Sequence, residues 1–163
     1  KRLESIGPLA IAGKTWLVSL AMAEDGIPDN VEDRLAACEL IMTHLTRSGL
    51  EAEQILFDPL VLPIAVDSTQ GLVTLKTIEQ IKSRYPAART VIGLSNISYG
   101  LPNRKLVNRA FLLMAAYAGL DAVILDPLDA KTMSFIKVTN MLTGRDPFCK
   151  EYIRAHRRGV LVE

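Results

Sequence analysis

The sequence has 163 residues, 49% of them apolar, which is enough for one domain with a substantial core. Its 19 Lys and Arg residues are balanced by 18 Asp and Glu residues, so we expect no nucleic-acid partner. The two cysteines, Cys38 and Cys149, have no metal-binding spacing, and we expect no bound metal. No apolar run reaches about 18 residues and no secretory signal begins the chain, so we expect a cytoplasmic protein without a membrane partner.

The predicted strands are short apolar runs. The chain begins within a helical pattern at residues 1–13, an abrupt start that suggests a cut N-terminus. The apolar runs follow at residues 15–23, 54–63, 90–96 and 121–127. Each is rich in Val, Ile and Leu and ends at turn-forming residues, as is typical of parallel strands that are covered on both faces.

The predicted helices lie between these strands. Residues 32–48 place an apolar stripe on one helical face, with Asp29 or Asn30 as the N-cap and Gly49 after the last turn. Further helices are predicted at 72–84, at 104–118 and from Asp129 to Leu142, and Pro147 is expected to begin a last one. This alternation predicts an α/β fold, either a small doubly wound sheet or half of an eight-stranded barrel.

Polar side chains gather where the predicted strands end, which is the edge where both α/β architectures place their sites. In chain order, the strand ends carry Met22, Glu24 and Asp25, then Asp58, then Ser95, Asn96, Ser98 and Tyr99, and finally Ile124 and Asp126.

Two of these residues point to a ligand. Asp58 interrupts an apolar run, so it either caps the next loop or faces a ligand, because a buried carboxylate needs a partner. Asn96 carries an amide that donates and accepts, which suits reading the edge of a heterocycle. The alternative is that Asn96 and the neighbouring serines only satisfy loop backbone. Gly93, inside a strand, indicates close approach to the backbone.

Other residue patterns narrow the chemistry. Arg104, at the start of a predicted helix, is either a surface residue or a partner for a carboxylate or phosphate. GxGxxG, GxxxxGK[ST], GxSxG and HExxH motifs are missing, and His44 and His156 are interpreted as surface residues. The candidate residues are therefore amides, hydroxyls and carboxylates, which suit the binding of a polar heterocycle.

Three stretches carry a family resemblance: "DGIP", "FDPLVLP" and "TVIGLSNISYGLPNRKLVNRAFLLMAAYAGLDAVILDP". They resemble the methyltetrahydrofolate:corrinoid (iron-sulfur) protein methyltransferases, with the pterin-binding domain of cobalamin-dependent methionine synthase and dihydropteroate synthase as more distant relatives. The resemblance implies a (β/α)8 TIM barrel of the pterin-binding type, usually a homodimer. Residues 1–163 would be its C-terminal half, covering strands five to eight. The first half would be absent from this sequence or supplied by another chain.

The resemblance also implies the central contacts of a pterin site. Asp58 matches the carboxylate that hydrogen-bonds the nitrogen-rich edge of the pterin. Ser95 and Asn96 match the next strand end, where the Asn amide lies near N5, and Asn96 is the expected catalytic residue. Gly93 would let the ring approach the backbone.

Peripheral contacts follow in the same way. Met22 and Ile124 match apolar positions beside the pterin, and Lys82 and Arg104 match basic positions near the folate. Tyr99 departs from the amide-bearing residue of some relatives, so it either stacks on the ligand or borders the corrinoid.

The implied activity belongs to one-carbon metabolism. A methyl group would move between N5 of methyltetrahydrofolate and the cobalt of a corrinoid, in an SN2-like transfer with N5 protonated or hydrogen-bonded. The corrinoid would be carried by a partner protein. Two alternatives are a non-catalytic module that binds a pterin or a corrinoid protein, and a dihydropteroate-synthase-like condensation.

Overall fold

The computed structural model describes residues 2–24 and 26–162, so Asp25 lies outside the described residues. The strands are β1 (Leu17–Leu20), β2 (Ile55–Asp58), β3 (Arg89–Gly93) and β4 (Ala122–Ile124). The α-helices are α1 (Arg2–Gly13), α2 (Val31–Arg47), α3 (Gln70–Arg84), α4 (Arg104–Tyr117), α5 (Ala130–Leu142) and α6 (Lys150–Arg157). Short 3-10 helices are η1 (Ala52–Gln54), η2 (Leu94–Ser98) and η3 (Pro147–Cys149).

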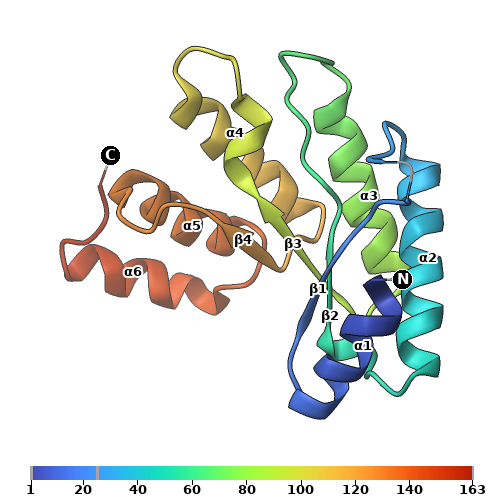
Figure 1. Cartoon of the computed structure of the whole chain (residues 1–163). Helices are drawn as coiled ribbons and strands as arrows, with labels where there is room; N and C mark the ends of the chain where they lie inside the picture. The colour runs from blue at the N-terminus through green and yellow to red at the C-terminus, as the bar shows by residue number, and fades with distance from the viewer. Residues whose placement is uncertain (1, 25, 163) are drawn as a thin grey trace.

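The four strands form one parallel sheet in the order β1-β2-β3-β4, at the centre of the molecule (Figure 1). Strand order therefore follows chain order, with no reversal. Right-handed crossovers between successive neighbours place every connecting helix on the same side of the sheet, as in a barrel. A doubly wound sheet needs a reversal of strand order, so the barrel-like alternative is the one confirmed.

Among the described residues, helices pack against one face of the sheet. Ile55 and Phe57 of β2 are fully buried in a cluster with α2 and α3, and Ile92 of β3 is fully buried in a second cluster with α3 and α4. On the opposite face, Val18 is 51% exposed and Ile124 is 63% exposed. This uncovered face is the one that would line the inside of a closed barrel.

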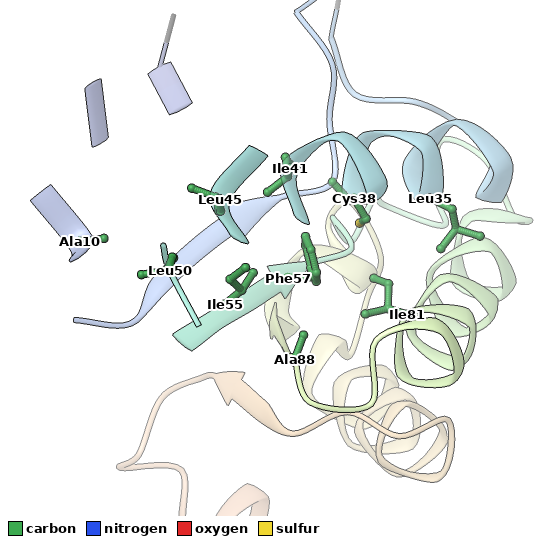
Figure 2. Close-up of a cluster of buried hydrophobic side chains, with 11 residues drawn as sticks. Ala10, Leu35, Cys38, Ile41, Leu45, Leu50, Ile55, Phe57, Ile81 and Ala88 are labelled. Atoms are coloured by element: carbon green, nitrogen blue, oxygen red, sulfur yellow. The ribbon is translucent and has the colours of Figure 1, made fainter. Parts of the chain in front are cut away.

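Figure 2 shows how the first cluster is filled. Side chains from α2 reach across to Ile55 and Phe57 of β2, and Ile81 of α3 closes the cluster from the side. Cys38 is fully buried here, and burial raises the pKa of its thiol to about 12. That thiol stays protonated near neutral pH and is a packing residue rather than a nucleophile.

Local signals placed the helix ends well. Asn30 is the N-cap of α2, with its side chain accepting from the Asp33 amide. Asp129 caps α5 in the same way, accepting from Thr132. Gly49 and Gly119 follow α2 and α4 with φ of 99° and 109°, a conformation that disfavours other residues. Among the described residues, no helix is long and apolar enough to cross a membrane.

Candidate functional site

The candidate site is the carboxyl edge of the sheet around the ends of β2 and β3. Asp58 is the last residue of β2, and Asn96 lies in η2, directly after β3. The sequence predicted that Ser95 and Asn96 end a strand, whereas the structure places both in the 3-10 helix that follows it. The structure nevertheless brings the two predicted residues to the ends of adjacent strands.

Asp58 is held in a tight turn. Its Oδ1 accepts a hydrogen bond from the amide of Leu60 at 2.9 Å, and Leu60 adopts a positive φ of 65°. Within the described residues, Oδ2 accepts no hydrogen bond, so one oxygen of the carboxylate is free to bind a ligand. Burial raises the pKa of Asp58, opposed by the Leu60 amide and by the positive charge of Arg34.

Arg34 is the residue that sequence reasoning missed. It projects from α2, is fully buried, and donates to the carbonyl oxygens of Pro28, Pro59 and Leu60 at 2.9–3.0 Å. Its position was a signal, because Arg34 falls in phase with Cys38, Ile41 and Leu45 on the buried stripe of the helix. A charged residue in such a stripe needs several hydrogen-bond partners, which here are loop carbonyls.

Asn96 is tied to the same turn. Its Nδ2 donates to the carbonyl oxygen of Val61 at 2.5 Å, three residues after Asp58. A carbonyl only accepts, so this contact fixes which end of the amide is the nitrogen. In the described part of the chain, Oδ1 of Asn96 accepts no hydrogen bond. The ends of two adjacent strands therefore present a free carboxylate oxygen, from Asp58, and a free amide oxygen, from Asn96.

Arg104 fixes the segment that carries Asn96. From the first turn of α4, its Nε donates to Ser98 Oγ at 3.1 Å and its NH2 donates to both the carbonyl and the hydroxyl of Ser95. The ring of Tyr99 lies 5.8 Å from the Arg104 guanidinium carbon, and its side chain is 63% exposed. Arg104 and Tyr99, both predicted from the resemblance, therefore lie at this edge, and Arg104 holds η2 in place.

The apolar residues predicted at the site lie on or beside the uncovered face. Gly93 pairs with Ile124 across β3 and β4, and both follow the alternation that places Asp58 on that face. A Cβ added to Gly93 would meet nothing within 4 Å, so space lies over this backbone. Met22 is half-buried in the loop after β1.

Lys82 is the exception among the predicted residues. It lies near the C-terminus of α3, and its Nζ contacts the carbonyl of Ala88 and the carboxylate of Asp121, each at 3.0 Å. Both partners precede strands, so Lys82 lies at the amino edge of the sheet, opposite the site. An α-helix that returns antiparallel to its strands brings its C-terminus to that edge, and we leave Lys82 out of the site.

A separate hollow lies between α3 and α4. It has a volume of about 410 Å³ and is lined mostly by apolar side chains, with Leu75, Ile97 and Phe111 among them. It includes neither Asp58 nor Asn96. In the described residues, no group of three or more His, Cys, Asp or Glu side chains is placed to hold a metal ion. The residues of the carboxyl edge offer polar recognition rather than a nucleophile.

Comparison with known proteins places this geometry in context. The family described as "Pterin binding enzyme" matches residues 14–126. Over 149 residues the chain is 34% identical to a "Methylcorrinoid:tetrahydrofolate methyltransferase" of Eubacterium limosum, covering 91% of this chain and 55% of that protein. It is also 36% identical over 115 residues to the "Methionine synthase" of Mycobacterium leprae, covering 66% of this chain and 10% of that protein. The chain therefore spans about half the length of the first relative and a small part of the second.

Proposed function

The chain belongs to the pterin binding enzyme family, and on this premise we propose that its carboxyl edge is part of a methyltetrahydrofolate site for methyl transfer to or from a corrinoid. The observation that carries the proposal is the placement of Asp58 and Asn96 at the ends of adjacent strands. The two side chains come from the ends of adjacent strands and are joined through the 58–61 turn by the bond from Asn96 to Val61.

The free atoms of the site suit a pterin. The amino-pyrimidine edge of a pterin carries N–H donors, and Asp58 Oδ2 is an unoccupied acceptor on the uncovered face. An ionised carboxylate strengthens such hydrogen bonds. Asp58 would therefore bind and orient the ring, while the open space over Gly93 accommodates the approach of the ligand to the backbone.

Asn96 would act at N5. Neutral N5 is a poor leaving group for the methyl transfer, because the nitrogen would depart as an anion. When N5 is protonated, the electron pair of the N5–CH₃ bond returns to a nitrogen that becomes neutral. The free Oδ1 of Asn96 is an acceptor that would hydrogen-bond that N5 proton, while Nδ2 stays anchored on Val61. The cobalt that exchanges the methyl group belongs to the corrinoid substrate.

The relatives support both substrates. The printed name of the Eubacterium limosum protein joins a methylcorrinoid to tetrahydrofolate, and the match covers 91% of this chain. The corrinoid would be carried by a partner protein, and a homodimer remains our expectation from the family resemblance. Since the chain spans 55% of that relative, we propose that the full site includes contributions from a further segment or chain.

The test measures methyl transfer directly, in the complete protein that contains this sequence. Cob(I)alamin mixed with methyltetrahydrofolate should convert to methylcob(III)alamin, followed by its absorbance change in single turnovers. We expect Asn96→Ala to slow transfer by about 10²–10³-fold at saturating folate, by analogy with the loss of one preorganised hydrogen-bonding group in other active sites. Asn140→Ala, in α5, is the matched control and should leave the rate unchanged.

The other outcomes separate the alternatives. Tetrahydrofolate binding without any methyl transfer would favour a non-catalytic pterin module. Condensation of a pterin pyrophosphate with an aromatic amine would favour a dihydropteroate-synthase-like reaction. An unchanged single-turnover rate in Asn96→Ala would remove Asn96 from the mechanism.

A further inference from the structure

Arg34 occupies an unusual position for a charged residue. Its side chain is fully buried, and within the described residues it forms no salt bridge with a carboxylate. Burial lowers the pKa of its guanidinium, opposed by the charges of Asp29 and Asp58. A buried charge without an ion-pair partner is costly, and packing alone would be served as well by an apolar residue. The position therefore calls for a reason beyond packing.

The hydrogen bonds of Arg34 join three segments of the carboxyl edge. Nε donates to Pro28 in the loop after β1, and NH1 donates to Pro59 and Leu60 in the turn after β2. NH2 donates to the side chain of Gln70 at 2.8 Å, at the first residue of α3. Gln70 in turn donates to the carbonyl of Asp29 and to the carboxylate of Asp67. One planar guanidinium thus fixes the relative positions of two loops and a helix start.

The turn after β2 transmits this arrangement to the site. The carbonyl of Leu60 accepts from Arg34, while the amide of the same residue donates to Asp58 Oδ1. The next residue, Val61, accepts the amide of Asn96. Leu60 holds a positive φ, a conformation that a Leu retains only when its surroundings fix it. Arg34 supplies two of the contacts that fix this turn.

We propose that Arg34 is a positioning residue of the candidate site: through the carbonyl groups of Pro59 and Leu60 it sets the orientation of the Asp58 carboxylate and of the Asn96 amide. In this role Arg34 acts through the backbone of the turn and not by contact with the ligand. The role in pterin binding rests on the proposed function, whereas the effect on the two side chains is a property of the ligand-free protein.

The first test therefore needs no ligand. In the complete protein, NMR follows the carboxyl ¹³C of Asp58 against pH and the side-chain amide of Asn96. We expect Arg34→Gln to raise the pKa of Asp58, because the opposing positive charge is lost. We also expect the Asn96 amide protons to lose their protection from exchange. In the part of the chain that the structure describes, the ionisable groups linked to this network besides Arg34 are Asp29, Asp58 and Asp67.

Two further variants show whether the effects of Arg34→Gln come from lost positioning, from lost charge or from a general loss of stability. Arg34→Lys keeps a positive charge but lacks the planar fork, so the Asn96 amide should lose protection while the Asp58 titration shifts less. Arg145→Gln is the matched control, since Arg145 also donates to backbone carbonyls, those of Leu120 and Ala116, at the amino edge. It should leave both signals unchanged. Where Arg34→Gln does not fold, Arg34→Lys carries the test.

The second test adds tetrahydrofolate and calorimetry. We expect both Arg34 variants to weaken binding by about tenfold, equivalent to about 1.4 kcal/mol, and the acid limb of binding to move to higher pH in Arg34→Gln. Unchanged NMR signals at Asp58 and Asn96 in a folded Arg34 variant would overturn the proposal. If the unmodified protein binds no tetrahydrofolate, the proposed function fails while the NMR result still decides the role of Arg34.

Discussion

Two turns of this protein have the same sequence, Asp-Pro-Leu, and each lies at the carboxyl end of a strand, yet their surroundings differ. In the 58–60 turn, the Asp accepts from the amide two residues later at 2.9 Å, and the 126–128 turn repeats this bond at the same length. In the first turn Asp58 is half-buried and Pro59 is buried, whereas in the second turn Asp126 and Pro127 are both exposed. Leu128 is 89% exposed, and Leu60 is half-buried at a positive φ.

The difference comes from residues distant in sequence. Arg34 of α2 and Thr74 of α3 contact the 58–60 turn, and η2 reaches it through Asn96 and Val61. The 126–128 turn leads within two residues into α5, capped by Asp129. The same tripeptide thus forms an exposed turn before α5 at the end of β4, and a turn contacted by α2, α3 and η2 at the end of β2. Local sequence sets the turn, and tertiary contacts decide whether its carboxylate serves a site.

The largest effect expected from this contrast is on tetrahydrofolate binding. Asp58→Asn keeps the acceptor for Leu60 but removes the negative charge that would hold the pterin edge, so we expect affinity to fall by about tenfold or more, as measured by calorimetry. Asp126→Asn makes the same change in the exposed turn. Equal losses in the two variants would mean that the two turns contribute alike and would break the comparison.

A smaller effect is expected on stability. Pro59 is buried, so Pro59→Ala loses packing in addition to the restriction that proline places on the unfolded chain, and should cost about 1–2 kcal/mol in the free energy of unfolding. Pro127 is exposed, and Pro127→Ala should cost less than about 1 kcal/mol. Urea titrations of the two variants measure the difference. A larger loss in Pro127→Ala would show that the exposed turn is the more constrained one.

The sequence predicted most of this architecture because its signals are local. Runs beginning near residues 15, 54, 90 and 121 became strands beginning at Leu17, Ile55, Arg89 and Ala122. Asn30 and Asp129 fixed helix starts through side-chain bonds that span three residues. The sheet order that decides between a barrel-like and a doubly wound arrangement is a tertiary property, and apolar periodicity alone left both open.

The site was predicted less completely for the same reason. Asp58 and Asn96 stood out because polar residues end apolar runs, and the edge follows from parallel strands. Lys82 was assigned by resemblance, and only the return direction of α3 shows that it faces the other edge. The place of Arg34 on the buried stripe of α2 was a signal, but the loop carbonyls to which it donates carry no signature in the sequence.

The smallest expected effect, on the pH dependence of stability, tests why the two turns differ. Burial raises the pKa of Asp58 in the folded protein above its unfolded value of about 3.9, so the folded state holds this proton more tightly than the unfolded state does. The protonated Asp58 carboxyl therefore stabilises the fold in full below its pKa in the unfolded chain, and this stabilisation is lost as pH rises through its pKa in the folded protein. Asp58→Asn cannot ionise and still accepts from Leu60.

Relative to the unmodified protein, Asp58→Asn should consequently gain stability as pH rises through this window, with a plateau above it, in urea titrations at a series of pH values. Asp126→Asn provides the control in the exposed turn, where we expect no burial-driven gain. The opposite slope for Asp58→Asn would mean that the Arg34 charge and the Leu60 amide outweigh burial. The carboxylate would then stabilise the fold, and its burial would no longer set the 58–60 turn apart as one shaped for a ligand at the expense of stability.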